Sequence, residues 1–354
     1  MEERRQCPFA ITLTSWRRRP TIKNKDVEEE NTGNQSNASH TNISLISFII
    51  AGVKHVLIAD IAEISLHLYD INLPIHVFSA IVHKFFGYLG FSVTNTGFSL
   101  SLGNMLISTL ICVIFSVYLQ MQIQITYDSA MIIFSSMYKL FAILEKWQLN
   151  YILKENYTKD IEKSKALLKR VHKIRAVKTY FEETIYMPPA FNEPWSAHSL
   201  RDFWGRRWHT YYNECFYRLG YQPVRLLVKL VSGCKPPRWL PALSVFVMSG
   251  LMHEYFLYVA TGPTMYFHGS PLPTGFFQFL FFVCQVVFVS IGDKYFKEGP
   301  LGRLFAIISM FITCHLFVVP YFESGYMHMP QFSFYRVAVN IYRGNPSLLD
   351  SVFK

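Results

Sequence analysis

Long uninterrupted apolar runs are the feature that most constrains the fold of this 354-residue chain. Four of them lie at residues 98–125, 240–260, 276–291 and 304–322. A helix needs about 20 apolar residues to cross the hydrocarbon core of a bilayer, and these runs approach or exceed that length. Because they are continuous and do not alternate apolar with polar residues, they favour helices over the strands of a membrane barrel. The sequence therefore predicts an all-α, polytopic membrane protein.

The charge distribution supports this class. Only 16% of the residues are charged, whereas 51% are hydrophobic, and the formal net charge is +10. The basic residues concentrate in the polar first 25 positions and between residues 145 and 178, as in loops held on the cytoplasmic side of a membrane. We therefore expect membrane lipid as a partner of the basic segments, and no nucleic acid.

The apolar runs predict about seven to nine transmembrane helices, with interfacial or re-entrant helices between them. The aromatic, half-polar stretch 180–239 suits such an interfacial position, and the loop 261–274 has no Lys or Arg and belongs on the far side. The spans expected before and after this stretch lie at residues 43–66, 73–91, 98–125, 129–144, 239–260, 276–291 and 304–322.

Five regions follow from this pattern. They are a polar cytoplasmic tail at 1–42, N-terminal transmembrane helices at 43–145, a basic amphipathic segment at 146–179, a core at 180–322 and a C-terminal segment at 323–354. The tail has no apolar stretch of the kind that a cleaved signal peptide contains, so we expect it to be retained.

An ionisable pair, His253 and Glu254, lies inside the predicted span 239–260. Charge is costly within a bilayer, so such residues usually have a function. An imidazole suits a general base, because its unperturbed pKa of about 6.5 lets it accept a proton at neutral pH. A hydrogen bond between helices is the alternative interpretation.

A second block, residues 199–209, is dense in tryptophan and arginine. Arg206 and Arg207 are candidate ligands for phosphate groups, since a guanidinium matches phosphate geometry. Trp204 and Trp208 are candidate substrate contacts, and His209 adds a second polar group. An aromatic belt facing lipid headgroups explains the same composition equally well.

Together, the Ser-Leu-Arg-Asp-Phe-Trp-Gly-Arg-Arg-Trp-His block at 199–209 and the Ser-Gly-Leu-Met-His-Glu-Tyr block at 249–255 closely resemble the wax-synthase-like branch of the membrane-bound O-acyltransferases. The resemblance is strongest from about residue 180 to 259. It implies a chamber of helices in the endoplasmic reticulum membrane, formed by the 180–322 core. Acyl-coenzyme A would enter it from the cytosol and a lipophilic alcohol from the bilayer.

The resemblance also implies roles for single residues. The histidine of the family corresponds to His253, as the general base. The other polar position of the family, commonly Asn, corresponds to His209, which is a departure that makes its charge state important. Glu254 is expected to orient His253 or to contact substrate, and Lys235 joins the two arginines as a candidate for the coenzyme A phosphates.

The implied reaction is acyl transfer from acyl-coenzyme A to a long-chain fatty alcohol, which gives a wax ester. A sterol acceptor and acetylation of a terpenoid or another secondary metabolite remain alternatives, because an apolar chamber discriminates weakly between chain lengths. From other classes, a proton-coupled lipid transporter and a catalytically silent relative remain open.

No cofactor or metal ion is expected beyond acyl-coenzyme A as co-substrate. The six cysteines form no CxxC pair and are interpreted as reduced packing residues. The sequence has no histidine boxes of the di-iron type, no phosphate-binding loop and no GxSxG turn. His198 and Asp202 fit an HxxxD pattern of soluble acyltransferases, but the glycine usual after the aspartate is replaced by Phe203.

Overall fold

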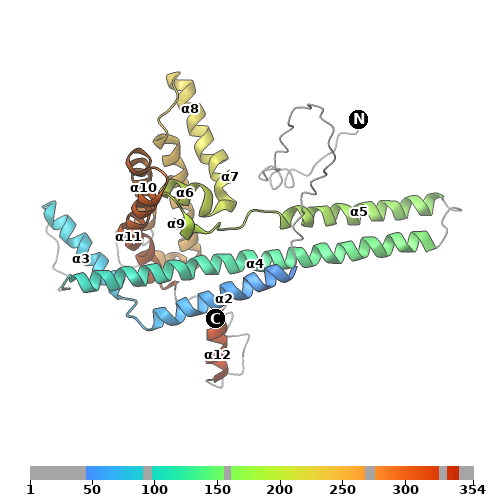
Figure 1. Cartoon of the computed structure of the whole chain (residues 1–354), viewed down its shortest axis with the longest axis horizontal. Helices are drawn as coiled ribbons and strands as arrows, with labels where there is room; N and C mark the ends of the chain where they lie inside the picture. Colours follow the sequence, from blue (N-terminus) through green and yellow to red (C-terminus); the bar gives the residue numbers. More distant parts are fainter. Residues whose placement is uncertain (1–44, 91–97, 155–160, 268–275, 327–332, 343–354) are drawn as a thin grey trace. The chain divides into compact units, whose positions relative to one another are not determined.

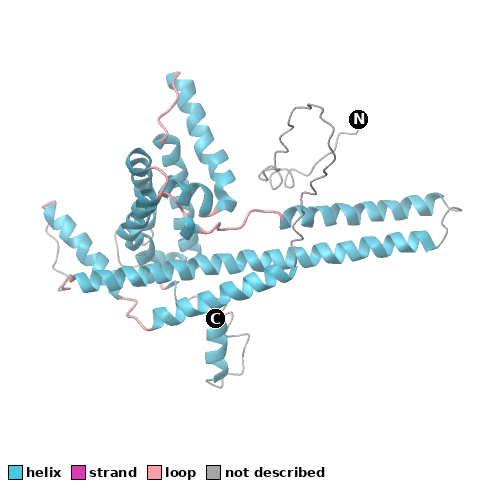
Figure 2. Cartoon of the chain, viewed as in Figure 1, coloured by secondary structure: helices cyan, strands magenta, loops and turns pink. Residues whose placement is uncertain are grey.

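The computed structural model describes residues 45–90, 98–154, 161–267, 276–326 and 333–342. Every regular element of these residues is helical, as Figure 2 shows, which confirms the predicted all-α class. The tail expected at 1–42 lies outside the described residues. The long helices are α2 (Leu45–His67), α3 (Leu73–Tyr88), α4 (Leu102–Lys154), α5 (Ile161–Ile185), α9 (Trp239–Tyr266), α10 (Phe276–Ile291) and α11 (Pro300–Glu323).

Five helices among the described residues are long and apolar enough to cross a bilayer, which confirms a polytopic membrane protein. They correspond to α2, α4, α9, α11 and the stretch Phe276–Phe296, which begins with α10. This is fewer than the seven to nine expected. With 16 residues, α3 is about 24 Å long, shorter than the hydrocarbon core of about 30 Å.

The break expected between residues 125 and 129 is wrong, because the predicted spans 98–125 and 129–144 form the single helix α4 (Figure 1). Its acidic residue at this point, Asp128, is buried and paired, with its carboxylate 2.5 Å from His55 Nδ1 of α2 and 3.2 Å from Gln124 Nε2. Because this charge has partners inside the protein, the helix does not have to end here to expose it to water. The expected boundary at residue 145/146 also falls inside this helix.

The chain divides into two compact units. The first contains Ala130–Met187, where the second part of α4 and the helix α5 run side by side (Figure 1). Glu145 joins them through Arg175 Nε at 2.7 Å and Lys178 Nζ at 2.5 Å. Phe181 of α5 packs between Phe134 and Phe141 of α4.

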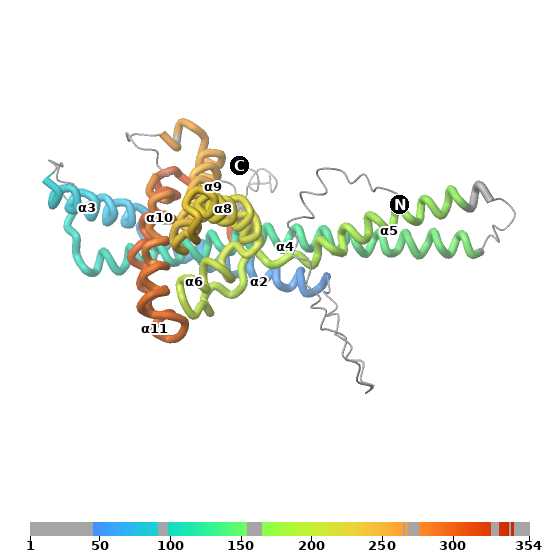
Figure 3. The backbone as a smooth tube through the Cα atoms, turned by 90° about the horizontal axis from the view of Figure 1, so that it is seen from above, coloured from blue at the N-terminus to red at the C-terminus, as the bar shows by residue number. Residues whose placement is uncertain are grey.

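The second unit contains Ala51–Ser129 and Pro188–Lys354, and it holds the main core. Helices α9, α10 and α11 lie together, as seen from above in Figure 3. Their buried apolar side chains, among them Leu257, Phe282 and Val318, form one cluster with residues of α2 and of the first part of α4. Phe282 and Phe317 of this cluster contact the candidate site.

Short elements connect α5 to α9. Two of them, η3 and η5, are π-helical turns, which often occur at functional sites. The amphipathic α8 leads from them towards α9. The elements are η2 (Pro194–Ser196), α6 (Leu200–Asp202), η3 (Phe203–Arg207), η4 (Thr210–Tyr212), α7 (Asn213–Phe216), η5 (Tyr217–Tyr221) and α8 (Gln222–Ser232); η6 (Gly292–Phe296) follows α10, and α12 (Phe334–Tyr342) ends the described chain.

The outer face of α2 carries a row of exposed apolar side chains at helical spacing. An apolar stripe of this kind is unfavourable in water and suits contact with lipid. The stripe consists of Ile50, Val53, Leu57, Ile61 and Ile64.

Candidate active site

His253 lies on α9 and its side chain is buried. Its ring stacks on Phe282 of α10, with centroids 4.6 Å apart, and meets Phe317 of α11 edge-on at 5.4 Å. Among the described residues, its Nε2 has no hydrogen-bond partner. Aromatic rings from two neighbouring helices thus fix the imidazole and leave one nitrogen free for a substrate.

His209 lies between η3 and η4, with its backbone in the left-handed region at φ 49°. Its ring is buried and packs near Phe191, Trp208 and Tyr212. Neither ring nitrogen finds a partner in the part of the chain that is described. Burial lowers the pKa of His209 from its ordinary value of 6.5 to about 4, so the ring is neutral at physiological pH.

The structure brings these two predicted residues together. The ring centroids of His209 and His253 lie 6.0 Å apart, and the ring planes are inclined by 44°. Three buried imidazole nitrogens therefore lack protein partners within one small region. A polar atom buried without a partner is costly, and such groups in native proteins often serve catalysis or ligand binding.

Trp204 forms part of the wall beside this pair. Its indole N–H donates to Gln285 Oε1 of α10 at 3.2 Å, and its ring meets Phe282 edge-on at 5.8 Å. Gln285 in turn donates from Nε2 to Thr313 Oγ1 of α11 at 3.1 Å. Trp208 stacks on Phe203, with centroids 5.4 Å apart.

The two predicted phosphate ligands differ in their surroundings. Arg207 Nε donates to Asp202 Oδ2 at 2.7 Å, and Arg207 also bonds the hydroxyl of Ser196 and, at 3.2 Å, the carbonyl oxygen of Glu193. These bonds engage Nε and Nη1 of Arg207 within the loop. Arg206 is exposed, and its nearest carboxylates are those of Asp202 and Glu298 at 3.8 and 3.7 Å, which leaves its guanidinium accessible. Lys235 is exposed beyond α8.

Asp202 acts as the anchor of this loop. Its buried carboxylate accepts the bond from Arg207 and another from the backbone N–H of His198 at 3.1 Å. Burial alone raises the pKa of Asp202, but these hydrogen bonds and the nearby guanidinium charges outweigh it and hold the pKa below its usual value. In the HxxxD pattern, the Asp202 carboxylate therefore bonds the backbone of His198 and the Arg207 side chain of the same loop.

The Glu254 carboxylate accepts hydrogen bonds from a backbone N–H and from a tyrosine hydroxyl. It accepts from the backbone N–H of Phe279 at 3.2 Å and from the hydroxyl of Tyr266. Tyr266 follows a kink in α9 at Gly262, where the backbone leaves the helical region at φ 77°. Glu254 thus links α9 to α10 and to the end of its own helix.

The sequence reasoning missed two fully buried glutamines of α10. Gln285 holds Trp204, and Gln278 donates from Nε2 to the carbonyl oxygen of Phe317 at 2.9 Å. Both stand in the otherwise apolar segment Phe276–Ile291 and are seven residues apart, on one helix face. Polar residues repeated at this spacing in an apolar span were the available signal.

Comparison with known proteins adds an independent observation. Residues 187–284 match the sequence profile of the Membrane bound O-acyl transferase family, and this segment contains His209, His253 and the residues around them. This segment is therefore similar to the membrane-bound O-acyltransferases. The predicted resemblance is thereby confirmed for the segment that holds the histidine pair.

Several curated proteins named long-chain-alcohol O-fatty-acyltransferases are similar to part of the chain. A protein of Simmondsia chinensis named long-chain-alcohol O-fatty-acyltransferase is 41% identical over 148 residues, which cover 40% of this chain and 38% of that protein. Probable long-chain-alcohol O-fatty-acyltransferase 7 of Arabidopsis thaliana is 33% identical over 149 residues, covering 41% and 40% of the two chains. The match thus spans less than half the length of these relatives. No solved structure matches the chain.

Proposed function

We propose that this chain is an acyl-coenzyme A-dependent O-acyltransferase that esterifies a lipophilic alcohol, with a long-chain fatty alcohol as acceptor and a wax ester as product. The observation that carries the proposal is the buried His209–His253 pair, with ring centroids 6.0 Å apart and with nitrogens lacking described protein partners. The names of the relatives support a fatty acyl group and a long-chain alcohol as the groups that are joined.

His253 acts as the general base. Its free Nε2 accepts the hydroxyl proton of the alcohol while the alcohol oxygen attacks the thioester carbonyl. The new C–O bond forms, the C–S bond breaks, and the proton passes from His253 to the departing thiolate of coenzyme A. The reaction is a direct transfer that requires neither a covalent enzyme intermediate nor a cofactor.

His209 acts as a positioning group for the thioester. Its pKa of about 4 keeps it neutral, so it donates one hydrogen bond without adding a charge to the apolar interior. A donor directed at the carbonyl oxygen stabilises the negative charge that develops there in the transition state. Aromatic side chains around both rings exclude water, which favours ester formation over hydrolysis of the thioester.

Arg206 is the residue that we assign to the phosphates of coenzyme A. It is exposed and lies in the same short block as His209, whereas Arg207 is engaged by the loop. We place the protein in the endoplasmic reticulum membrane, where a tagged chain should overlap with a resident marker of that membrane.

The test uses microsomes that contain the chain or its His253→Ala variant, supplied with labelled acetyl- or palmitoyl-coenzyme A and with fatty alcohol, sterol or extracted lipid. We expect a labelled wax ester from palmitoyl-coenzyme A, and a loss of at least about 100-fold in the variant because a general base is removed. His172→Ala, which alters an exposed histidine of α5, is the matched control and should keep the activity.

Three outcomes would contradict the proposal. Normal turnover by a correctly inserted His253→Ala variant would remove the assigned base. A sterol ester or an acetylated lipid in place of a wax ester would change the substrate class. If no ester forms with any pair, acyl transfer is excluded under these conditions and labelled lipid uptake is the next assay.

A further inference from the structure

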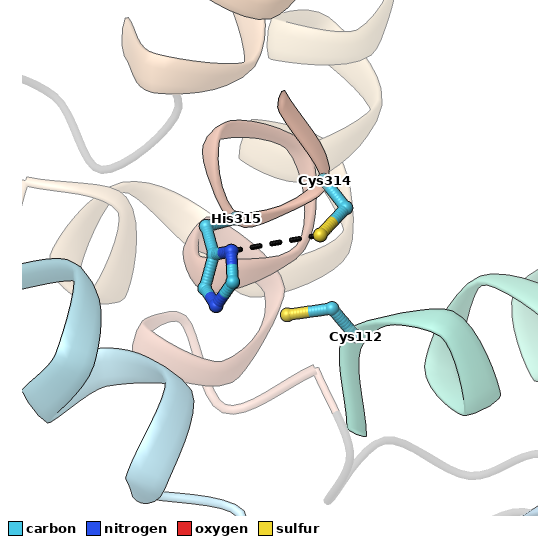
Figure 4. Close-up of side chains that lie close together, drawn as sticks. All are labelled: Cys112, Cys314 and His315. Carbon is cyan, nitrogen blue, oxygen red and sulfur yellow. Dashed lines mark hydrogen bonds between the residues drawn. The ribbon is translucent and has the colours of Figure 1, made fainter. Parts of the chain in front are cut away.

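Cys112, Cys314 and His315 form a buried cluster of metal-binding side chains that includes neither residue of the histidine pair (Figure 4). Cys112 comes from α4, and the other two are neighbours on α11. The two sulfur atoms and a ring nitrogen of His315 all lie within 4.8 Å of one another. Two cysteines and one histidine are a ligand set that proteins use for zinc.

The distances within the cluster are close to those of a tetrahedral zinc site. Cys314 Sγ lies 3.5 Å from His315 Nδ1. Zinc bonds of about 2.3 Å to sulfur and about 2.1 Å to nitrogen place two ligand atoms of a tetrahedron about 3.6 Å apart. The adjacent residues of α11 are therefore already spaced as two ligands of one ion.

The other ring nitrogen of His315 has the partner that a metal-bound histidine requires. Nε2 lies 2.6 Å from Ser108 Oγ, one helical turn before Cys112 on α4. A hydrogen bond at the distal nitrogen fixes the orientation and the tautomer of a metal-binding imidazole. With Nε2 carrying its proton, Nδ1 presents a lone pair towards the two sulfur atoms.

The surroundings select the charge of the ion. Cys112 and Cys314 belong to the apolar core, together with Phe115 and Val318. An uncompensated charge is strongly disfavoured there. A divalent ion with two thiolates and one neutral imidazole has no net charge, whereas Cu⁺ would leave one negative charge. Thiolate and imidazole ligands together also favour zinc over Mg²⁺ or Ca²⁺.

We propose that Cys112, Cys314 and His315 bind one zinc ion that joins α4 to α11. Each cysteine thiol releases its proton on binding, and the three side chains leave one tetrahedral position for a small ligand such as water. The acyl transfer proposed above does not use this ion. The ion fixes α11 at His315. Two residues further along this helix, Phe317 packs against His253.

The test is metal analysis of the full-length chain, purified in detergent through an epitope tag that does not bind metals. We expect about one zinc ion per chain, and its loss in Cys112→Ala and in Cys314→Ala. Cys284→Ala is the matched control, because Cys284 lies on α10 outside the cluster, and it should retain the ion. Zinc that persists in both cluster variants would overturn the proposal.

A measurement on the unaltered chain is independent of whether the variants fold. After removal of zinc with a chelator, Co²⁺ is added and the absorption spectrum is recorded. Intense sulfur-to-cobalt bands in the near ultraviolet, together with visible bands of tetrahedral cobalt, are expected. The proposal would be overturned if the wild type showed neither bound zinc nor these cobalt bands. A disulfide between Cys112 and Cys314, detected by peptide mass spectrometry, would also overturn it.

Discussion

His209 has a backbone conformation that limits which residues can replace it. At φ 49° the main chain is in the left-handed region, where a Cβ atom crowds the following carbonyl group. Asn, Asp and His are enriched there among residues other than glycine. The family resemblance implies Asn at this position, and Asn and His share both a tolerance for this backbone and a polar side chain.

This conformation predicts opposite results for two substitutions. His209→Asn should insert normally and retain part of the transfer activity, because the amide can donate a hydrogen bond. His209→Val should lower the melting temperature in detergent, since a β-branched residue in this region costs about 1–2 kcal/mol or more. Thermal unfolding and ester formation are measured on both; equal stability of the two variants would contradict the backbone argument.

The burial of His209 also predicts a dependence of stability on pH. Its folded-state pKa is about 4 against an ordinary value of 6.5, so the unfolded chain binds more protons between these values. The contribution, about 3 kcal/mol in magnitude, is fully present above pH 6.5 and is lost as the pH falls towards 4. His209→Asn should therefore reduce the fall in melting temperature between pH 6.5 and pH 4.5. An unchanged fall would show that His209 does not titrate as inferred.

At the scale of the elements, the contact of α9 with α10 depends on Gly250. A Cβ atom there would lie 2.9 Å from the ring of Phe279 and 3.3 Å from its Cα atom. Glu254, one turn further along α9, binds the backbone N–H of the same residue. The two helices are therefore fixed at this point by a close approach and by a hydrogen bond.

Gly250→Ala should push α10 away from α9 and lower the transfer rate, because Phe282 of α10 stacks on His253. Overpacking of this kind costs about 1–3 kcal/mol. Gly87→Ala on α3 is the control, since a Cβ atom there meets nothing within 4 Å. Melting temperature and ester formation are compared between the two; a Gly250→Ala variant as active and stable as the control would refute the close packing.

The sequence predicted the long apolar helices well and the polar interruptions poorly. The expected spans at 43–66 and 304–322 agree with α2 and α11 to within a few residues, because apolar length alone defines them. The sequence predicts two spans where the structure has the single helix α4. The reason is Asp128, whose partner His55 lies 73 residues away and cannot be identified from local sequence. The π-helical turns η3 and η5 likewise depend on tertiary contacts.

The same distinction holds for the candidate site. The resemblance singled out His209 and His253, and the structure adds their distance. The partners of Arg207 and Glu254, and the role of Gln285, depend on side chains from other helices. The zinc ligands have no motif spacing, because Cys112 and Cys314 meet only when α4 packs beside α11.

At the scale of the whole molecule, α2 near the beginning of the described chain is bound to α12 near its end. Arg336 Nε lies 2.5 Å from the buried Glu63 carboxylate, and Ser333 Oγ donates to Asp60 Oδ1 at 2.8 Å. These contacts join residues 273 positions apart. The helix α12 and the residue before it are therefore joined to α2 by an ion pair and a hydrogen bond.

Arg336→Ala should destabilise the protein by about 3–5 kcal/mol, because it leaves the buried Glu63 charge uncompensated. The melting temperature in detergent is measured, with Arg225→Ala on the exposed face of α8 as the control. The double variant Glu63→Gln, Arg336→Gln should recover part of the loss, since neither charge remains. A double variant no more stable than Arg336→Ala would contradict the pairing.

The unpartnered imidazole nitrogens of His209 and His253 also determine how strongly the site distinguishes an alcohol from an alkane of equal chain length. An alkane fills the same apolar surroundings as an alcohol but gives these nitrogens no hydrogen bond. Each buried group left without a partner costs about 1–3 kcal/mol of binding free energy. A site built to bond a hydroxyl therefore rejects the analogue that lacks it far more strongly than it rejects one extra methylene. Selectivity thus resides at one polar atom of the acceptor, and the long tail behind it is free to vary.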